Sequence, residues 1–174
     1  MLVGLSLLAG TSQGGAVPGT GTAASVTAAD LGVLAHALVF QEPPVPDKGV
    51  IAIAYAAGDP ASQRDAAAIL AEIGSGLATA NGTLRPVLVD TATLASSRFQ
   101  VLIPAAGAAG PALKRAWQKQ HALCVTTDLA SVRNGSCIIG IRTAPRVNII
   151  LNGEAARQAG IRFATAFLMM INEL

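Results

Sequence analysis

The sequence predicts a single three-layer α/β domain with a mostly parallel sheet. Continuous apolar runs such as GVIAIAY at 49–55 are typical of parallel strands that are covered on both faces. These runs alternate along the chain with segments of helical periodicity, and the last two runs follow each other as in an antiparallel pair. The chain has 174 residues, of which 52% are hydrophobic, so one domain can bury a substantial core.

The first two predicted helices have clear start and stop signals. Thr27 suits an N-cap, and Asp30 stands three residues later, where it completes a capping box. Apolar residues then recur at helical spacing until the Pro–Pro pair at 43–44 ends the helix. After the strand at 49–55, Asp59 can cap a second helix, with Pro60 at its first position and Gly74 at its end.

The rest of the chain continues the alternation and then closes the sheet. Strands are predicted at 84–90, 99–105, 123–127, 136–142 and 147–151, with a helix at 110–121. Asn152 can cap a short helix that Gly160 closes, and a final helix is predicted at 164–171. The expected architecture is Rossmann-like, with an antiparallel strand pair at its end.

The N-terminal residues 1–26 read as a signal-like leader and a flexible linker, which leaves 27–174 as the domain. LVGLSLLAG at 2–10 is too short to span a bilayer, and a tract rich in Gly, Ala and Thr follows it. Cleavage positions lie near Ala16 and at Ala23–Ala24. No Lys or Arg precedes the apolar run, so a leader without a targeting role is the alternative. We expect export to the periplasm.

The two cysteines, Cys124 and Cys137, are expected to form a disulfide that braces a hairpin of adjacent antiparallel strands. Such strands bring Cα atoms within the range that a disulfide needs, and an exported protein favours the bond. Two buried free thiols, or a metal or redox site, are the alternatives. The sequence has no CxxC motif, and its two histidines, His36 and His121, fall in different helices.

No constellation of residues predicts catalysis, a cofactor or a metal. The sequence has no G-x-S-x-G elbow and no glycine-rich nucleotide loop. With a net charge of +2 and scattered basic residues, it also gives no support to nucleic-acid binding. The loops at 56–63, 104–111 and 127–135 could instead hold a small solute. The candidate ligand-binding residues are Asp59, Ser62, Asp128 and Arg133, although acidic residues at such turns more often serve simply as helix caps.

Several segments resemble the YfiR-like family of periplasmic regulators. LGVLAHALVFQEPP matches the family's first helix, and IAIAYAAGDP with AAAIL matches its strand, turn and second helix. VNIILNGEAARQAGIRFATAFLMMI matches the closing segment, with Asn152, Ala155, Ala156, Gly160 and Ile161 at corresponding places. The likeness covers residues 27–171. FQEPP replaces the family's usual aromatic–Trp–Pro, and only one disulfide can form.

The resemblance implies a protein that acts by binding and not as an enzyme. Its best-known member restrains a membrane-bound diguanylate cyclase, an enzyme of cyclic di-GMP signalling, through that enzyme's periplasmic domain. The implied partner is therefore the periplasmic domain of an inner-membrane signalling protein, and a homodimer is left open. Such a regulator should expose an apolar patch on its first or last helix. Phe163, Phe167, Met169 and Met170 are candidates, with a place in the core as their alternative.

A weaker resemblance points to one lobe of the TrpX-type substrate-binding proteins of ABC transporters. IAIAYAAGDPASQRDAAAIL is similar to their first strand, loop and helix, and VTTDLASVRNGSCIIGI to a segment that lines their cleft. It implies a small-solute-binding domain. Because those proteins enclose a ligand between two lobes, one lobe alone would need a further subunit to complete the site.

Overall fold

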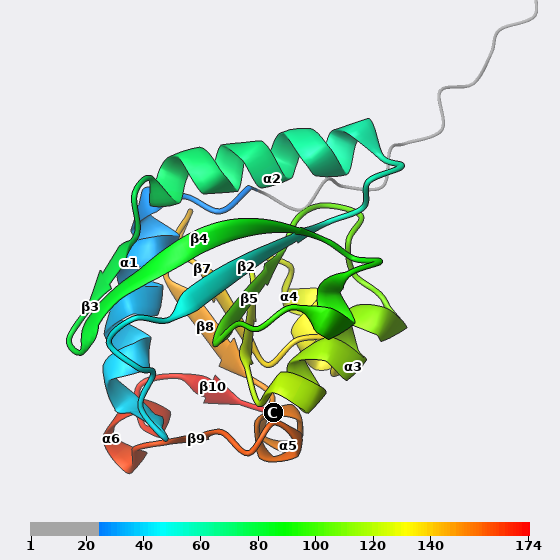
Figure 1. The fold of residues 1–174 in the computed structure, drawn as a ribbon. Helices are drawn as coiled ribbons and strands as arrows, with labels where there is room; N and C mark the ends of the chain where they lie inside the picture. Colours follow the sequence, from blue (N-terminus) through cyan, green and yellow to red (C-terminus); the bar gives the residue numbers. More distant parts are fainter. Residues whose placement is uncertain (1–24) are drawn as a thin grey trace, which may run out of the picture.

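The computed structural model describes residues 25–174, which form one α/β domain. Its main sheet has eight strands, in the spatial order β10 (Asn172–Glu173), β8 (Asn148–Leu151), β7 (Ile139–Arg142), β6 (Leu123–Thr126), β5 (Val101–Pro104), β2 (Val50–Tyr55), β4 (Gly82–Asp90) and β3 (Leu77–Thr79). The five strands from β7 to β4 are parallel, whereas β8 and β3 run antiparallel to their neighbours β7 and β4. The predicted fold class and its closing antiparallel pair are confirmed (Figure 1).

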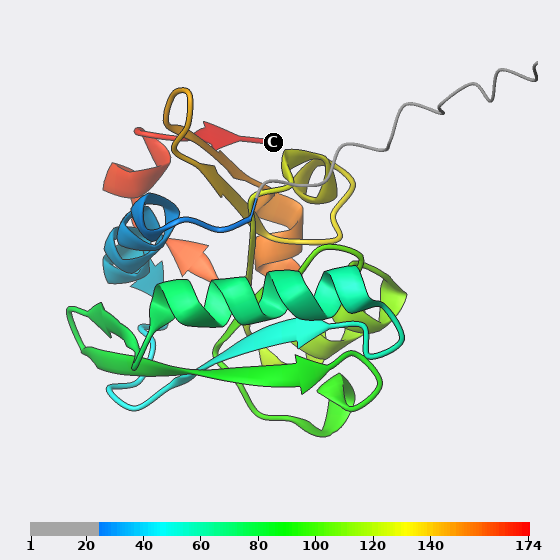
Figure 2. The ribbon, with the colours of Figure 1, turned by 90° about the horizontal axis from the view of Figure 1, so that it is seen from above.

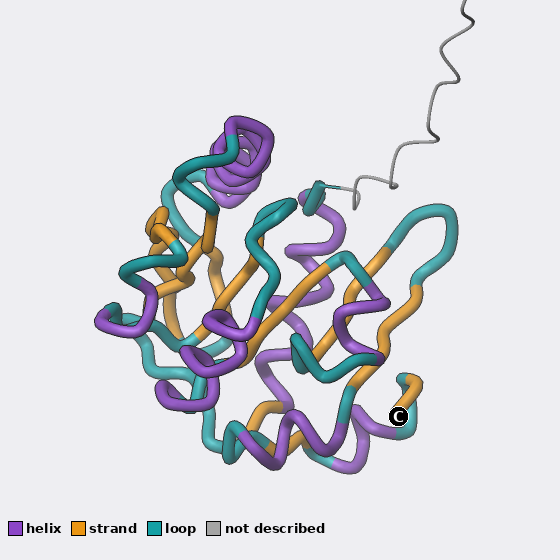
Figure 3. Tube along the Cα trace, turned by 90° about the vertical axis from the view of Figure 1, so that its right-hand side faces the viewer, coloured by secondary structure: helices purple, strands orange, loops and turns teal. Residues whose placement is uncertain are grey.

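Helices lie on both sides of this sheet (Figures 1 and 3). They are α1 (Ala28–Ala37), α2 (Pro60–Ile73), α3 (Pro111–Gln120), α4 (Leu129–Arg133), α5 (Gly153–Gln158) and α6 (Thr165–Leu168), with the 3-10 turns η1 (Leu38–Phe40) and η2 (Leu94–Ser96). The chain moves from β2 outward to β4, and then back past β2 to β5. Because crossovers between parallel strands are right-handed, this reversal places α2 and α3 on opposite faces.

The local signals in the sequence place the helix ends. Thr27 and Asp30 form a complete capping box at the start of α1. Asp59 caps α2, which has Pro60 at its first position and Gly74 as its C-cap, and Asn152 caps α5. Each of these side chains accepts a backbone N–H that the first turn of a helix leaves without an intrahelical partner.

The core is mainly aliphatic, with a few buried aromatic residues. The residues of β2 from Ile51 to Ala54 have no exposed surface, because helices or loops cover both faces of the strand. Trp117 of α3 is fully buried, and its indole N–H donates to the carbonyl of Ser136 at 3.0 Å. This bond satisfies the only polar atom of the indole and joins α3 to the loop that carries Cys137.

Cys124 and Cys137 form the predicted disulfide, but they do not brace a hairpin. Their Cα atoms are 5.0 Å apart, and both residues are fully buried. Cys124 lies in β6 and Cys137 just before β7, and these two strands are parallel. The prediction that the two cysteine-bearing strands are antiparallel is therefore wrong. The intervening residues form α4, capped by Asp128, and this short helix carries the chain back so that β7 starts beside β6.

The last segment also differs from its prediction. The helix expected at 164–171 is only α6, four residues long, after which the chain turns into β10. Two-residue strands β1 (Gln41–Glu42) and β9 (Arg162–Phe163) form a separate antiparallel sheet. The amide of Leu174 donates to the carbonyl of Leu151, so the chain end extends the edge of the main sheet. These pairings join residues that are far apart in the sequence, so no local sequence pattern predicts them.

The predicted leader and linker lie almost entirely outside the described residues. Of that segment, only Ser25 and Val26 are described. Val26 is 8% exposed and belongs to the core, so the folded unit includes at least one residue before Thr27. Among residues 25–174, no helix combines the length and apolar character required to cross a membrane.

Candidate functional site

The carboxyl ends of the parallel strands form the first candidate site. The strand order reverses between β2 and β5, and open α/β sheets bind ligands where such a reversal separates two loops. Here the two loops touch, since a Cβ atom added at Gly107 would lie 2.8 Å from Oδ2 of Asp59. Gly107 has φ +74°, a conformation that favours glycine. The loops at 56–63 and 104–111 are therefore brought together as the sequence suggested, but little space remains between them.

The predicted polar residues at this edge satisfy backbone groups of the fold. Asp59 accepts from the amide of Ala61 at 2.8 Å, and the fully buried Ser62 accepts from the amide of Ala56 at 3.0 Å. Asp128 accepts from the amide of Ala130 at 3.0 Å and from the hydroxyl of Ser131 at 2.6 Å. These side chains act as caps and loop braces.

The cavity at this edge measures about 70 Å³, which is room for a few water molecules. Of the four predicted ligand-binding residues, only Asp128 lines it. Asp59 and Ser62 lie in the adjoining loop and helix, and Arg133 is exposed at the end of α4. Asp65 also lines the cavity and accepts from the amide of Ala106 at 2.8 Å. The sequence reasoning missed it, because it faces inward only through a contact 41 residues away.

A second candidate site is an apolar groove between α1, β8 and the segment around α6. Its volume is about 500 Å³. Its lining residues are Ala29, Gly32, Val33, His36, Ala37, Val147, Ile149, Phe167, Met170 and Ile171. The α1 members recur at helical spacing and form one face of that helix. A Cβ atom added at Gly32 would meet nothing within 4 Å, so this glycine leaves a notch in the groove.

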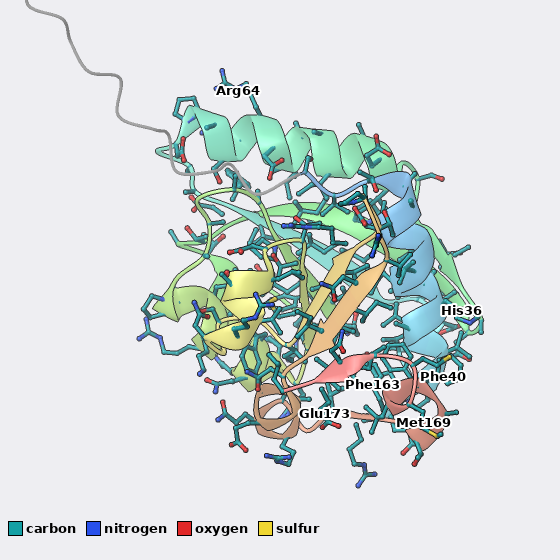
Figure 4. The ribbon with its side chains drawn as sticks, turned by 180° about the vertical axis from the view of Figure 1, so that it is seen from behind. His36, Phe40, Arg64, Phe163, Met169 and Glu173 are labelled. Atoms are coloured by element: carbon teal, nitrogen blue, oxygen red, sulfur yellow. A yellow bond between two sulfur atoms is a disulfide. The ribbon has the colours of Figure 1, made fainter. Side chains whose placement is uncertain are left out.

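An aromatic cluster forms one end of the groove (Figure 4). The rings of His36 and Phe40 meet edge to face at 5.7 Å, and Phe40 stacks on Phe167 at 5.6 Å. Phe167 in turn stacks on Phe163 at 5.1 Å. This chain of contacts ties η1 and β9 to α6 and holds a four-residue helix in place.

The four apolar residues that the sequence singled out divide into two pairs. Phe163 and Phe167 are 7% and 3% exposed, so they belong to the core. Met169 and Met170 are 84% and 63% exposed, and Val147 at the other side of the groove is 65% exposed. Large apolar side chains that gather at an apolar groove mark an interaction surface more often than scattered ones do. The exposed patch expected on the last helix is therefore present just beyond its C-terminal end.

Asp30 anchors the helix that forms one wall of the groove. Its carboxylate accepts from the amide and hydroxyl of Thr27, and from the amide and hydroxyl of Thr143 after β7. Burial raises the pKa of Asp30, but these hydrogen bonds outweigh burial and hold the pKa below its ordinary value. The start of α1 is thus fixed to the turn that carries Val147 on the opposite wall.

No metal site is evident in residues 25–174, since no group of three His, Cys, Asp or Glu side chains there could hold an ion. Comparison with known proteins adds no assignment: no family model matches the chain, and no match is found among curated proteins. The candidate sites therefore rest on their own geometry. The apolar groove is the larger of the two, and Val147 and Met170 of its lining are exposed.

Proposed function

We propose that this chain is a non-enzymatic regulatory protein of the periplasm that binds the periplasmic domain of an inner-membrane signalling protein. The observation that carries this proposal is the groove of about 500 Å³ flanked by the exposed Met169, Met170 and Val147. The resemblance to YfiR-like proteins agrees with it and names the partner class, for example a diguanylate cyclase. The disulfide is compatible with an exported protein.

The groove fits a partner that presents apolar side chains together with acidic ones. None of its lining residues is acidic. His36 is exposed at one end, and the exposed Arg146 stands next to Val147 at the other. A protein segment with apolar anchors and a flanking carboxylate would fill the groove and place that carboxylate beside the guanidinium of Arg146.

The alternative of a small-solute-binding domain has less support. Solute pockets usually measure 300 to 1,000 Å³ and offer free polar groups. The cavity at the carboxyl edge measures about 70 Å³. The carboxylates there already accept hydrogen bonds from the backbone. No observation favours this alternative over the groove.

The groove is tested by filling it. A Cβ atom at position 32 meets nothing within 4 Å, so Gly32→Leu directs a large side chain into the notch, whereas Gly32→Ala leaves most of the groove open. In a host that lacks the native gene, we expect wild-type protein and Gly32→Ala to restore the normal cyclic di-GMP level. Gly32→Leu should behave like the deletion, because the partner can no longer enter the groove.

A photo-cross-linking residue at position 169 should capture the same inner-membrane signalling protein, and Gly32→Leu should abolish the capture. The same residue at position 87, on the far edge of the sheet, is the matched control and should capture none of it. Full regulation by Gly32→Leu at normal protein levels would refute the groove as the docking site.

A further inference from the structure

The outer edge of β4 is open over most of its length. The edge strand β3 pairs with β4 only from Gly82 to Leu84. From Arg85 to Asp90, β4 pairs with β2 on one side and, within residues 25–174, with no strand on the other. Figure 2 shows this stretch along the border of the sheet, under α2. Open edges attract further strands, and natural proteins usually block them.

The pairing with β2 determines which backbone groups of β4 face outward. The amide of Arg85 donates to Gly49 at 2.9 Å, and the amide of Thr91 donates to Tyr55 at 2.9 Å. Because N–H and C=O directions alternate along a strand, residues 85, 87 and 89 face β2, and residues 86, 88 and 90 face outward. Pro86 has no N–H, and the carbonyl of Asp90 already accepts from Thr93.

Four outward groups remain: the carbonyl of Pro86, the amide and carbonyl of Leu88, and the amide of Asp90. We propose that a second copy of this chain pairs with them, antiparallel, about a two-fold axis at Leu88. The two Leu88 residues then exchange two hydrogen bonds, and each Asp90 amide donates to the Pro86 carbonyl of the other copy. Each of the four outward groups then has a partner. Pro86, which has no N–H to donate, faces the Asp90 carbonyl of the other copy, and that carbonyl already accepts from the amide of Thr93.

Neighbouring registers leave outward backbone groups without a partner. If Leu88 faced Pro86, the Leu88 carbonyl of each copy would lack a donor, because proline has no N–H. If Leu88 faced Asp90, its amide would point at a carbonyl that already accepts a hydrogen bond from Thr93. The open edge is therefore self-complementary in one register, as an isologous two-fold interface requires.

Side chains agree with this pairing. Val87 and Leu88 are 45% and 41% exposed, and the two-fold axis sets Leu88 against Leu88 and Val87 against Val89 of the other copy. The same register sets Pro86 against Asp90 and Arg85 against Thr91 of the other copy, so it places no two like charges directly opposite each other. A single strand edge is a small interface, and we expect dimerisation in the micromolar range.

A cysteine at position 88 tests the register. Directly opposite residues of a hydrogen-bonded antiparallel pair have Cα atoms about 5.5 Å apart, which a disulfide can join. The two native cysteines are already bonded to each other, so Leu88→Cys adds the one reactive thiol of residues 25–174. We expect mild oxidation to give a covalent dimer. Val87→Cys should give none, because its opposite residue is Val89. Equal cross-linking at both positions would overturn the register.

The edge itself is tested by Leu88→Pro, measured by light scattering across a concentration series of the full chain. Since the Leu88 amide does not bond to β2, proline there should leave the ladder intact and remove the central donor. Leu88→Lys is a second variant, should proline disturb the fold. We expect both to be monomeric at concentrations where wild type and Met169→Lys dimerise. A monomeric wild type, or a dimer that both Leu88 variants retain, would overturn the proposal.

Discussion

Asp30 shows how much one side chain can hold together. Its carboxylate joins the start of α1 to Thr143, 113 residues away, while it also completes the capping box with Thr27. The sequence predicts the local half of this role, since the S/T-x-x-D/E spacing is a pattern of neighbours. The bond to Thr143 depends on how α1 packs against the end of β7, and no residue pattern records it.

Asp30→Asn should lower the free energy of unfolding by about 2 kcal/mol at neutral pH, because an amide cannot accept four hydrogen bonds as a carboxylate does. The folded-state pKa lies below the ordinary value of 3.8. The stabilisation is thus fully present above that pH and is lost as the pH falls below it. Urea unfolding of wild type and Asp30→Asn at neutral pH and at about pH 3 should show the difference shrink. Asp47→Asn, at an exposed aspartate, is the control.

A difference between wild type and Asp30→Asn that stays constant over this pH range would contradict the role assigned to the carboxylate. The hydrogen bonds from Thr143 to Asp30 would then not be what holds the start of α1 against the turn at Val147.

Among the elements, the short segment between β6 and β7 is braced by the disulfide. The cysteines enclose a sequence separation of 13, and a loop of this size should stabilise by about 3 kcal/mol in the chain-entropy model. The double variant Cys124→Ala, Cys137→Ala should lose about that much in urea unfolding. Reductant should destabilise the wild type and leave the variant unchanged. Equal stability with and without reductant would mean that the disulfide does not constrain the unfolded chain.

Substitutions at Gly32 of helix α1 can distinguish an effect on folding from an effect on binding. Gly32 lies in its interior with open space beside it, and glycine there costs about 1 kcal/mol relative to alanine. Gly32→Ala should therefore raise the midpoint of urea unfolding, and Gly32→Leu should not lower it below wild type. Loss of regulation in Gly32→Leu could then be assigned to the filled groove. A destabilised Gly32→Leu would instead mean that the groove cannot accept a side chain.

At the scale of the whole molecule, export and the disulfide can be tested together. The mature protein from its native host should begin within residues 16–26, and its intact mass should rise by two alkyl groups only after reduction. That result would place the domain outside the cytoplasm with Cys124 and Cys137 joined. An uncleaved chain whose thiols alkylate without reductant would contradict a periplasmic role.

The sequence by itself predicted the α/β class, the mostly parallel sheet and the helix caps. These features depend on periodicity, on capping residues within one turn, or on the composition of the whole chain. It also proposed Asp59 and Ser62 as ligand-binding residues, whereas in the structure they accept backbone hydrogen bonds and brace loops. A carboxylate that caps a helix and one that binds a ligand look alike in sequence.

The tertiary structure alone decided which apolar residues are exposed and where the groove lies. Phe167 and Met170 are three residues apart in one apolar run, yet one is buried in the aromatic cluster and the other faces outward. Likewise, the open edge of β4 exists because β3 ends after three residues and no other strand of residues 25–174 pairs with the rest of that edge. Exposure depends on which distant segments pack over a residue, and packing partners are set by the fold as a whole.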